Sequence, residues 1–165
     1  MTTRRIITGH AADGRSIVAE DGMVPHVRTL PGASFDEIWS TRQAPEVLGR
    51  VPAGEPTSPA PRIGPPPGGS VIRVIDFLPA NAGGVRSPMH RTRSIDYGVV
   101  LDGEVVLLLS DSERVLGPGD VVIQRGTDHA WENRSDKPAR MVFILIDAAF
   151  DAELDALIAD QQLTP

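Results

Sequence analysis

The sequence predicts an all-β fold, a sandwich or barrel of short strands, with further short strands at the N-terminus and one helix at the C-terminus. From residue 70 onward, β-branched and aromatic runs alternate with turn sequences rich in Gly, Asp, Asn and Pro. Short strands at such close spacing are typical of sandwiches and barrels rather than of parallel α/β sheets. A helical apolar period occurs only in the last part of the chain.

Each element follows from its local pattern. Strands are predicted at 70–78, 95–101, 104–110, 120–124, 129–133 and 139–147, and strand-like pieces at 4–9, 15–22 and 24–30. Ser34 and Glu37 have capping-box spacing, so residues 34–40 are equally consistent with a helical turn and with a strand. A C-terminal helix is predicted at 149–162, with Phe150, Leu154, Leu157 and Ile158 on a face that we expect to pack on the sheet.

The chain of 165 residues has room for one structural domain, in which three stretches differ in composition. Residues 1–51 form an N-terminal extension with short strands, and residues 70–165 form the barrel and the C-terminal helix. Residues 52–69 are rich in Pro and Gly, which excludes regular structure because Pro lacks the N–H group that a ladder needs. We expect this strap to be semi-rigid and to lie over the domain or over a partner subunit.

Composition excludes several classes of function. The net charge is −6, and fifteen Arg and one Lys are spread along the chain, so a nucleic-acid surface is not expected. Without Cys there is no disulfide or thiolate site, and any metal ligand would have to be His, Asp, Glu or another oxygen donor. No segment reaches the length that spans a bilayer, so we expect no membrane partner and a cytoplasmic location.

Two of the four histidines are candidates for a functional site. His10 and His26 lie in turn-like contexts and are interpreted as solvent-facing or capping residues. His90 and His129 each begin a strand after a turn that contains Gly or Pro, a position from which a side chain can point into the mouth of a sheet.

Strand alternation groups further polar residues with this histidine pair. Together they would form a cavity that contains two imidazoles, a carboxylate, hydroxyls and an indole, which is the composition of a small-molecule pocket. Arg91 and Arg93 have the opposite parity and are expected at the surface or in an interface. The predicted catalytic residues are His90, His129 and Asp96, and the predicted substrate-binding residues are Thr92, Trp131, Asn133 and, as an anion anchor, Arg73.

Two motifs in the second half of the chain resemble those of the cupins, over about residues 70–147. The first runs Gly84, five residues, His90, one residue, Thr92, three residues, Asp96, six residues, Gly103, and the second runs Gly119, Asp120, "VVIQR", Gly126, two residues, His129, three residues, Asn133. Gln124 stands where the second motif usually has proline. This resemblance to small single-barrel cupins implies a double-stranded β-helix, the jelly-roll barrel, with a ligand site in its mouth.

The resemblance also implies a metal site. In cupins that bind metal, two histidines and a glutamate of the first motif join the histidine of the second around one ion. Here Thr92 replaces the second of those histidines, and Asp96 replaces the glutamate. The implied ligands are therefore His90, Asp96 and His129, around a divalent ion such as Fe, Mn, Zn or Ni.

Three functions remain open at this stage. The first is a metal-dependent enzyme that catalyses elimination or dehydration, isomerisation or oxygenation of a carbonyl-containing small molecule. The second is a metal-free lyase or dehydratase in which a histidine is the general base. The third is a non-catalytic cupin that binds a small molecule. Exposed sheet edges favour a homodimer, with the N-terminal strands or the strap crossing the interface.

Overall fold

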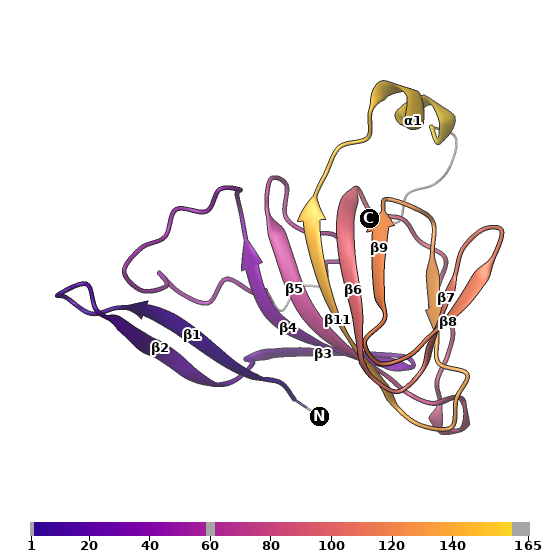
Figure 1. The fold of residues 1–165 in the computed structure, drawn as a ribbon, viewed down its shortest axis with the longest axis horizontal. Helices are drawn as coiled ribbons and strands as arrows, with labels where there is room; N and C mark the ends of the chain where they lie inside the picture. Colours follow the sequence, from indigo (N-terminus) through magenta and orange to yellow (C-terminus); the bar gives the residue numbers. More distant parts are fainter. Residues whose placement is uncertain (1, 59–61, 160–165) are drawn as a thin grey trace.

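Three β-sheets form the framework of the computed structural model, which describes residues 2–58 and 62–159 (Figure 1). The largest sheet has the strand order β3-β4-β5-β11-β6-β9, the second has the order β10-β7-β8, and the third is the hairpin β1-β2. The strands are β1 Arg4–His10, β2 Ser16–Met23, β3 His26–Leu30, β4 Ala33–Thr41, β5 Ser70–Phe77, β6 Ser94–Asp102, β7 Val105–Leu108, β8 Glu113–Leu116, β9 Val121–Arg125, β10 Ala130–Glu132 and β11 Ala139–Asp147.

The core lies between the six-stranded and the three-stranded sheets. In β11, every second side chain is buried, and Met141, Phe143 and Leu145 point inward. β11 is paired antiparallel with both β5 and β6, so its inner face is at the centre of the barrel. Trp131 of β10 packs against this face from the opposite sheet, with its ring centroid 5.3 Å from that of Phe143. The predicted all-β jelly-roll barrel is confirmed.

The six strands predicted from residue 70 onward are all present, with ends that differ by a few residues. β8 was not predicted, because its sequence, "ERVL", is short and half charged and follows a turn signal. The segment that begins at Ser34 is a strand, since it lies within β4 and pairs with both β3 and β5. Glu37 therefore does not cap a helix but lies directly opposite Arg73 of β5.

The C-terminal helix is shorter than predicted and does not pack on the sheet. Helix α1 spans Ala152–Leu157 and contains no buried residue, and Leu157 is 72% exposed. In Figure 1 it stands beyond the end of β11. Phe150, which precedes the helix, instead contacts the barrel at Gly126 and lies under the Arg93 guanidinium. The prediction of a packed apolar face was wrong, and residues 160–162 of the predicted helix lie outside the described residues.

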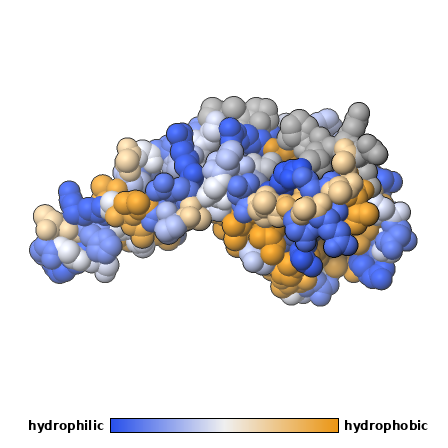
Figure 2. Space-filling view, turned by 90° about the horizontal axis from the view of Figure 1, so that it is seen from above, coloured by the Kyte–Doolittle hydropathy of each residue, from blue (hydrophilic) through white to orange (hydrophobic). Residues whose placement is uncertain are grey.

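The hairpin β1-β2 projects from the barrel as an arm, residues 2–23 (Figures 1 and 2). Its root is fixed to the large sheet, because the Thr3 amide donates to the buried carboxylate of Asp36 at 2.6 Å. Along the hairpin, large apolar side chains face solvent, among them Ile6, Val18 and Met23. A two-stranded hairpin with exposed apolar residues is marginally stable by itself, so the arm is a candidate interaction surface.

The described residues of the strap, 52–58 and 62–69, form neither helix nor strand, as predicted. Glu55 accepts two hydrogen bonds from Arg5 of the arm, at 3.0 and 2.6 Å, and one from the Thr57 hydroxyl. His26 of β3 bonds the same hydroxyl at 2.8 Å, so it is a partner of the strap. These contacts fix residues 55–57 against the N-terminal strands.

Within the described part of the chain, no helix is long and apolar enough to cross a membrane.

Candidate functional site

His90 and His129 lie side by side across a two-residue antiparallel bridge. Each backbone N–H donates to the carbonyl of the other residue, at 3.0 and 2.9 Å. This pairing directs the two side chains to the same face, and their ring centroids are 4.2 Å apart. The bridge thus brings together two residues that are 39 positions apart in sequence.

Both rings are oriented by the same kind of hydrogen bond. Nδ1 of His90 lies 2.9 Å from the Pro88 carbonyl, and Nδ1 of His129 lies 2.9 Å from the Thr127 carbonyl. A carbonyl only accepts, so each Nδ1 carries the hydrogen and the lone pair of the neutral ring is on Nε2. Neither Nε2 has a hydrogen bond to a described residue. Two imidazole lone pairs are therefore available to a ligand.

His129 is neutral at physiological pH. Burial, together with charge repulsion from the adjacent His90, lowers the pKa of its imidazole to about 4, against smaller opposing effects of the Thr127 carbonyl and the Asp128 carboxylate. Its side chain is held among Trp131 and other buried groups, with only 4% of the residue exposed. His129 can thus accept a proton or coordinate an ion without first losing a proton.

The carboxylate of Asp96 belongs to a short chain of hydroxyl groups on the same face. The Ser94 hydroxyl donates to Oδ1 of Asp96 at 2.6 Å and lies 2.8 Å from the Thr92 hydroxyl. All three residues are buried. Burial raises the pKa of Asp96, and the bond from Ser94 and the charge of His90 act in the opposite direction. Asp96 is therefore close enough to His90 to interact with it electrostatically.

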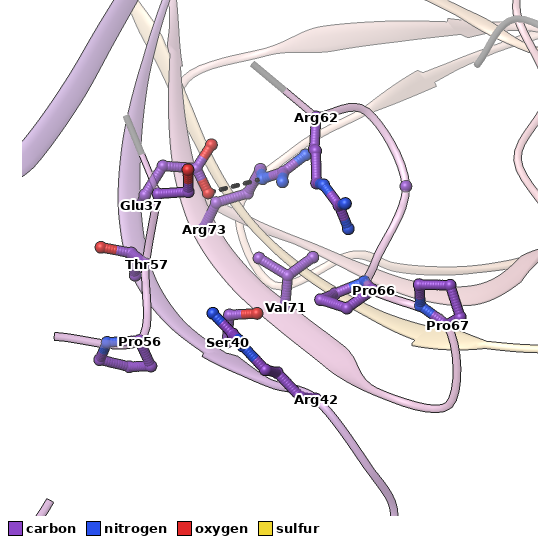
Figure 3. Close-up of a pocket in the computed structure, with 12 residues that line it drawn as sticks. Glu37, Ser40, Arg42, Pro56, Thr57, Arg62, Pro66, Pro67, Val71 and Arg73 are labelled. Atoms are coloured by element: carbon purple, nitrogen blue, oxygen red, sulfur yellow. Dashed lines mark hydrogen bonds and ion pairs between the residues drawn. The ribbon is translucent and has the colours of Figure 1, made fainter. Parts of the chain in front are cut away.

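Arg73, the predicted anion anchor, is buried in β5 and already has partners. Its Nε donates to Oε2 of Glu37 at 3.3 Å, and its Nη1 donates to the Ile63 carbonyl of the strap at 2.9 Å. Burial lowers the pKa of its guanidinium, and Glu37 opposes this shift. Figure 3 shows the pair at one wall of a pocket of about 440 Å³ between the strap and the strands β4 and β5.

Trp131 and Asn133 have different roles. Trp131 contacts His129 edge to face, with ring centroids 6.1 Å apart, and forms an apolar wall behind the histidines. The Asn133 amide donates to the carbonyls of Phe77 and Lys137 and accepts from the amide and hydroxyl of Ser135, so all four of its hydrogen-bonding positions are used within the protein. Asn133 braces the loop that follows β10.

The two arginines that were expected at the surface have different environments. Arg93 is exposed and pairs with Asp155 at 2.6 Å. Arg91 is 5% exposed and pairs with Asp128, also at 2.6 Å. The prediction of a surface position was therefore wrong for Arg91, because its ion pair with Asp128 allows the guanidinium to be buried next to the histidine bridge.

Comparison with known proteins identifies the family. A cupin domain family matches residues 80–145. The chain is 41% identical over 152 residues to the cupin-domain-containing oxidoreductase fogC of Aspergillus ruber, and the match covers 87% of this chain and 71% of that protein. The chain belongs to the cupin family. The resemblance of its two motifs to those of the cupins is thereby confirmed.

A second relative agrees with this assignment, and a solved structure is similar in part. The cupin is 36% identical over 155 residues to the cupin-domain-containing oxidoreductase virC of Hypocrea virens, covering 88% of this chain and 76% of that protein. A solved cupin 2 conserved barrel domain protein from Salinispora arenicola is similar with a TM-score of 0.41 and 21% identity, over 56% of this chain and 72% of that chain.

The site of this cupin fits a divalent ion with two of the three expected ligands. The two free Nε2 atoms are suitable donors, and hydrogen bonds from Nδ1 to backbone carbonyls are the usual support for metal-ligating histidines. Among residues 2–58 and 62–159, however, no three His, Cys, Asp or Glu side chains form a group that could hold a metal. Asp96, the third expected ligand, accepts a hydrogen bond from Ser94.

Gln124 is a residue of the site to which the sequence analysis gave no role. It lies in β9 directly opposite Asp96 of β6 and is 4% exposed. Its Nε2 is buried without a hydrogen-bond partner among the described residues. A buried amide donor without a partner is costly, and a ligand in the cavity could bond it. The available signal was a polar residue at a motif position where cupins usually have proline.

Proposed function

We propose that this cupin is an enzyme that acts on a small, carbonyl-containing organic molecule, with His90 and His129 as its chemical centre. The observation that carries the proposal is the pair of adjacent rings, each held through Nδ1 and each with an unused lone pair on Nε2. The hydroxyl of Thr92 and the amide of Gln124 are proposed to bind substrate oxygen atoms, with Trp131 as the wall of the cavity. The relatives named as cupin-domain-containing oxidoreductases support an enzyme in general.

In the form that we favour, the two histidines bind a divalent metal ion. Neutral imidazoles are good ligands for Fe, Mn, Zn and Ni, and the low pKa of His129 keeps its ring in the ligating form. Such an ion would supply Lewis-acid polarisation of a carbonyl oxygen or redox chemistry. The protein's own contribution is to hold both rings in place through the carbonyls of Pro88 and Thr127.

One observation supports a second form, without metal. The carboxylate of Asp96 accepts a hydrogen bond from Ser94, and no group of three metal-ligating side chains is found among the described residues. In this form His129 is the general base of a lyase or dehydratase, and its Nε2 accepts the proton that is removed next to the substrate carbonyl. Asp96 stabilises the resulting imidazolium through its negative charge, and Thr92 bonds the substrate oxygen.

Metal analysis separates the two forms. The wild type, His90→Gln, His129→Gln and His10→Gln are purified without chelator, and divalent metals are measured by mass spectrometry. Turnover of a panel of small hydroxyaldehydes and ketones is followed on the same samples. We expect about one ion per chain, lost in both site variants and retained in His10→Gln, whose histidine is exposed and far from the site.

The outcomes that contradict the proposal are also clear. A wild type that turns over substrate without metal, and loses turnover in His129→Gln, would support the metal-free form. If both site variants are folded by circular dichroism and keep wild-type metal content and turnover, the histidine pair is not the centre. A wild type that binds panel compounds and converts none would leave the non-catalytic binding protein as the remaining function.

We further propose that the functional unit is a homodimer in which the arm packs against the second copy. Support comes from the exposed apolar side chains of a hairpin that pairs with no third strand within the described structure. Burial of these side chains in a partner would remove apolar surface from water.

A further inference from the structure

We propose that the pocket between the strap and the strands β4 and β5 binds the carboxylate of a small organic anion, and that this anion is the substrate of the cupin site. The inference rests on the proposed function, because it names the class of molecule on which the histidine pair acts. The pocket has a volume of about 440 Å³ and is lined by both charged and apolar side chains (Figure 3).

Two of the three arginines that line the pocket give it a positive charge. Arg73 at the inner wall is neutralised by Glu37, at 3.3 Å. Arg42 and Arg62 line the same pocket at its solvent-facing side, and neither forms an ion pair with a described residue. Their guanidinium groups extend from opposite sides of the pocket in Figure 3. The pocket is thus positively charged in a chain whose net charge is −6, which favours an anionic ligand.

The remaining lining favours an organic anion over an inorganic one. Pro66 and Pro67 of the strap and Val71 of β5 form an apolar surface beside the Arg42 and Arg62 guanidinium groups. A carboxylate suits this arrangement, since guanidinium groups bind carboxylates with directed hydrogen bonds and the apolar surface accommodates the carbon body.

The pocket and the histidine site are two parts of one inner face of the large sheet. In the strand register Ser40 is paired with Val71, Val71 with Leu145, Leu145 with Asp96, and Asp96 with Gln124. Ser40 and Val71 line the pocket, whereas Asp96 and Gln124 belong to the histidine site. Because β5 and β6 are separated by one strand, Val71 and Asp96 are roughly 10 Å apart.

The strap also connects the two parts. A Cβ on Gly64, which lines the pocket, would lie 3.8 Å from Cγ2 of Thr92. A substrate with its carboxylate between Arg42 and Arg62 and a chain of several carbon atoms could therefore extend along the inner face toward Thr92 and Asp96. The guanidinium pair would fix one end, and the reacting group would lie at the other.

Hexanoate and hexanamide are the probes that test this assignment, because they have the same carbon chain and differ in charge. Binding is measured by isothermal titration calorimetry to the wild type, Arg42→Gln, Arg62→Gln and the double variant. Arg125→Gln is the matched control, since Arg125 is exposed on β9 and outside the pocket. Both pocket arginines are partly solvated, so we expect each single variant to weaken hexanoate binding roughly threefold to tenfold and the double variant to weaken it further.

The result that supports the proposal is saturable binding of hexanoate that is tighter than that of hexanamide, weakened in the Arg42 and Arg62 variants and unchanged in Arg125→Gln. Equal binding of the two probes, unchanged affinity in the double variant, or no saturable binding of hexanoate would overturn it. The variants His90→Gln and His129→Gln keep this failure distinct from failure of the proposed function. Both variants are expected to bind hexanoate with wild-type affinity and to lose turnover of the hydroxyaldehyde and ketone panel. If hexanoate binding is lost in the histidine variants instead, the pocket assignment alone is overturned.

Discussion

At the scale of single residues, His129 links burial to chemistry. The pKa of its imidazole is about 4 in the folded chain, below the ordinary value of 6.5. Between pH 6.5 and 4 the His129 ring is protonated in the unfolded chain and neutral in the folded chain. The free energy of unfolding therefore falls as the pH decreases from 6.5 to 4. We expect a loss of about 2–3 kcal/mol across this window.

The measurement is urea unfolding of chelator-treated protein at several pH values between 4 and 7. In His129→Gln this part of the pH dependence should disappear, whereas His10→Gln should retain it. A direct titration of the His129 ring by NMR with a midpoint near 6.5 would contradict the expectation.

Gln124 and Asn133 are buried amides with opposite degrees of hydrogen bonding. Gln124 has an Nε2 without a partner, and the Asn133 side chain uses all its positions. Gln124→Met retains the side-chain volume. It should lower the free energy of unfolding by less than about 1 kcal/mol, or raise it. Asn133→Leu should cost about 2–3 kcal/mol, because it removes the four hydrogen bonds of the Asn133 side chain. Chemical denaturation measures both, and a strongly destabilised Gln124→Met would show that its amide has a structural partner.

At the scale of elements, the β6-β7 turn depends on Gly103. Its φ is +75°, and a Cβ at this position would lie 2.5 Å from the Pro138 carbonyl oxygen. Gly103→Ala should therefore cost roughly 2–4 kcal/mol through left-handed backbone strain and steric overlap. Gly117→Ala is the control, because a Cβ there meets no atom within 4 Å. Thermal unfolding should show a clear decrease in Tm for the first variant and little change for the second.

The strap provides a second test at this scale. Arg5 lowers the pKa of Glu55 to about 2 from 4.5, with smaller contributions from Thr57. A lowered pKa in the folded chain means that the stabilisation is present above pH 4.5 and is lost as the pH falls toward 2. The carboxylate is 29% exposed, so we expect only about 1 kcal/mol.

Glu55→Gln should remove this contribution at neutral pH and flatten the stability profile between pH 4.5 and 2. Glu104→Gln, which alters an exposed glutamate in the β6-β7 turn, should leave the profile unchanged. Equal profiles for the wild type and Glu55→Gln would mean that the contact between arm and strap is not formed in solution.

At the scale of the whole molecule, the arm predicts a homodimer. Val18 of β2 is 61% exposed, and Leu157 of α1 is 72% exposed. If the arm packs on a second copy, Val18→Asp should shift sedimentation from dimer toward monomer, because a carboxylate would be buried in an apolar interface. Leu157→Asp should leave the dimer intact. A monomeric wild type would remove the prediction.

Local sequence patterns were sufficient for much of this molecule. Alternation along each strand predicted that His90, Thr92 and Asp96 share a face, because side-chain direction in a strand depends only on position along that strand. Spacing and turn residues predicted the barrel strands and the two motifs that identify the family. The Pro-rich composition of the strap was enough to exclude regular structure, since proline removes backbone donors wherever it occurs.

Only the tertiary structure decided which distant residues meet. The pairing of Glu37 with Arg73, the burial of Arg91 beside Asp128 and the position of the strap over β4 and β5 depend on strand register and on how the sheets close. Helix α1 illustrates the same limit, because an amphipathic pattern is local whereas the surface available to its apolar face is not. The sequence by itself determined the cupin fold and the two histidines. The folded chain decided the orientation of their rings, the burial of Asp96 and the grouping of Arg42 and Arg62 at one pocket, because these properties arise from burial and from contacts between segments far apart in sequence.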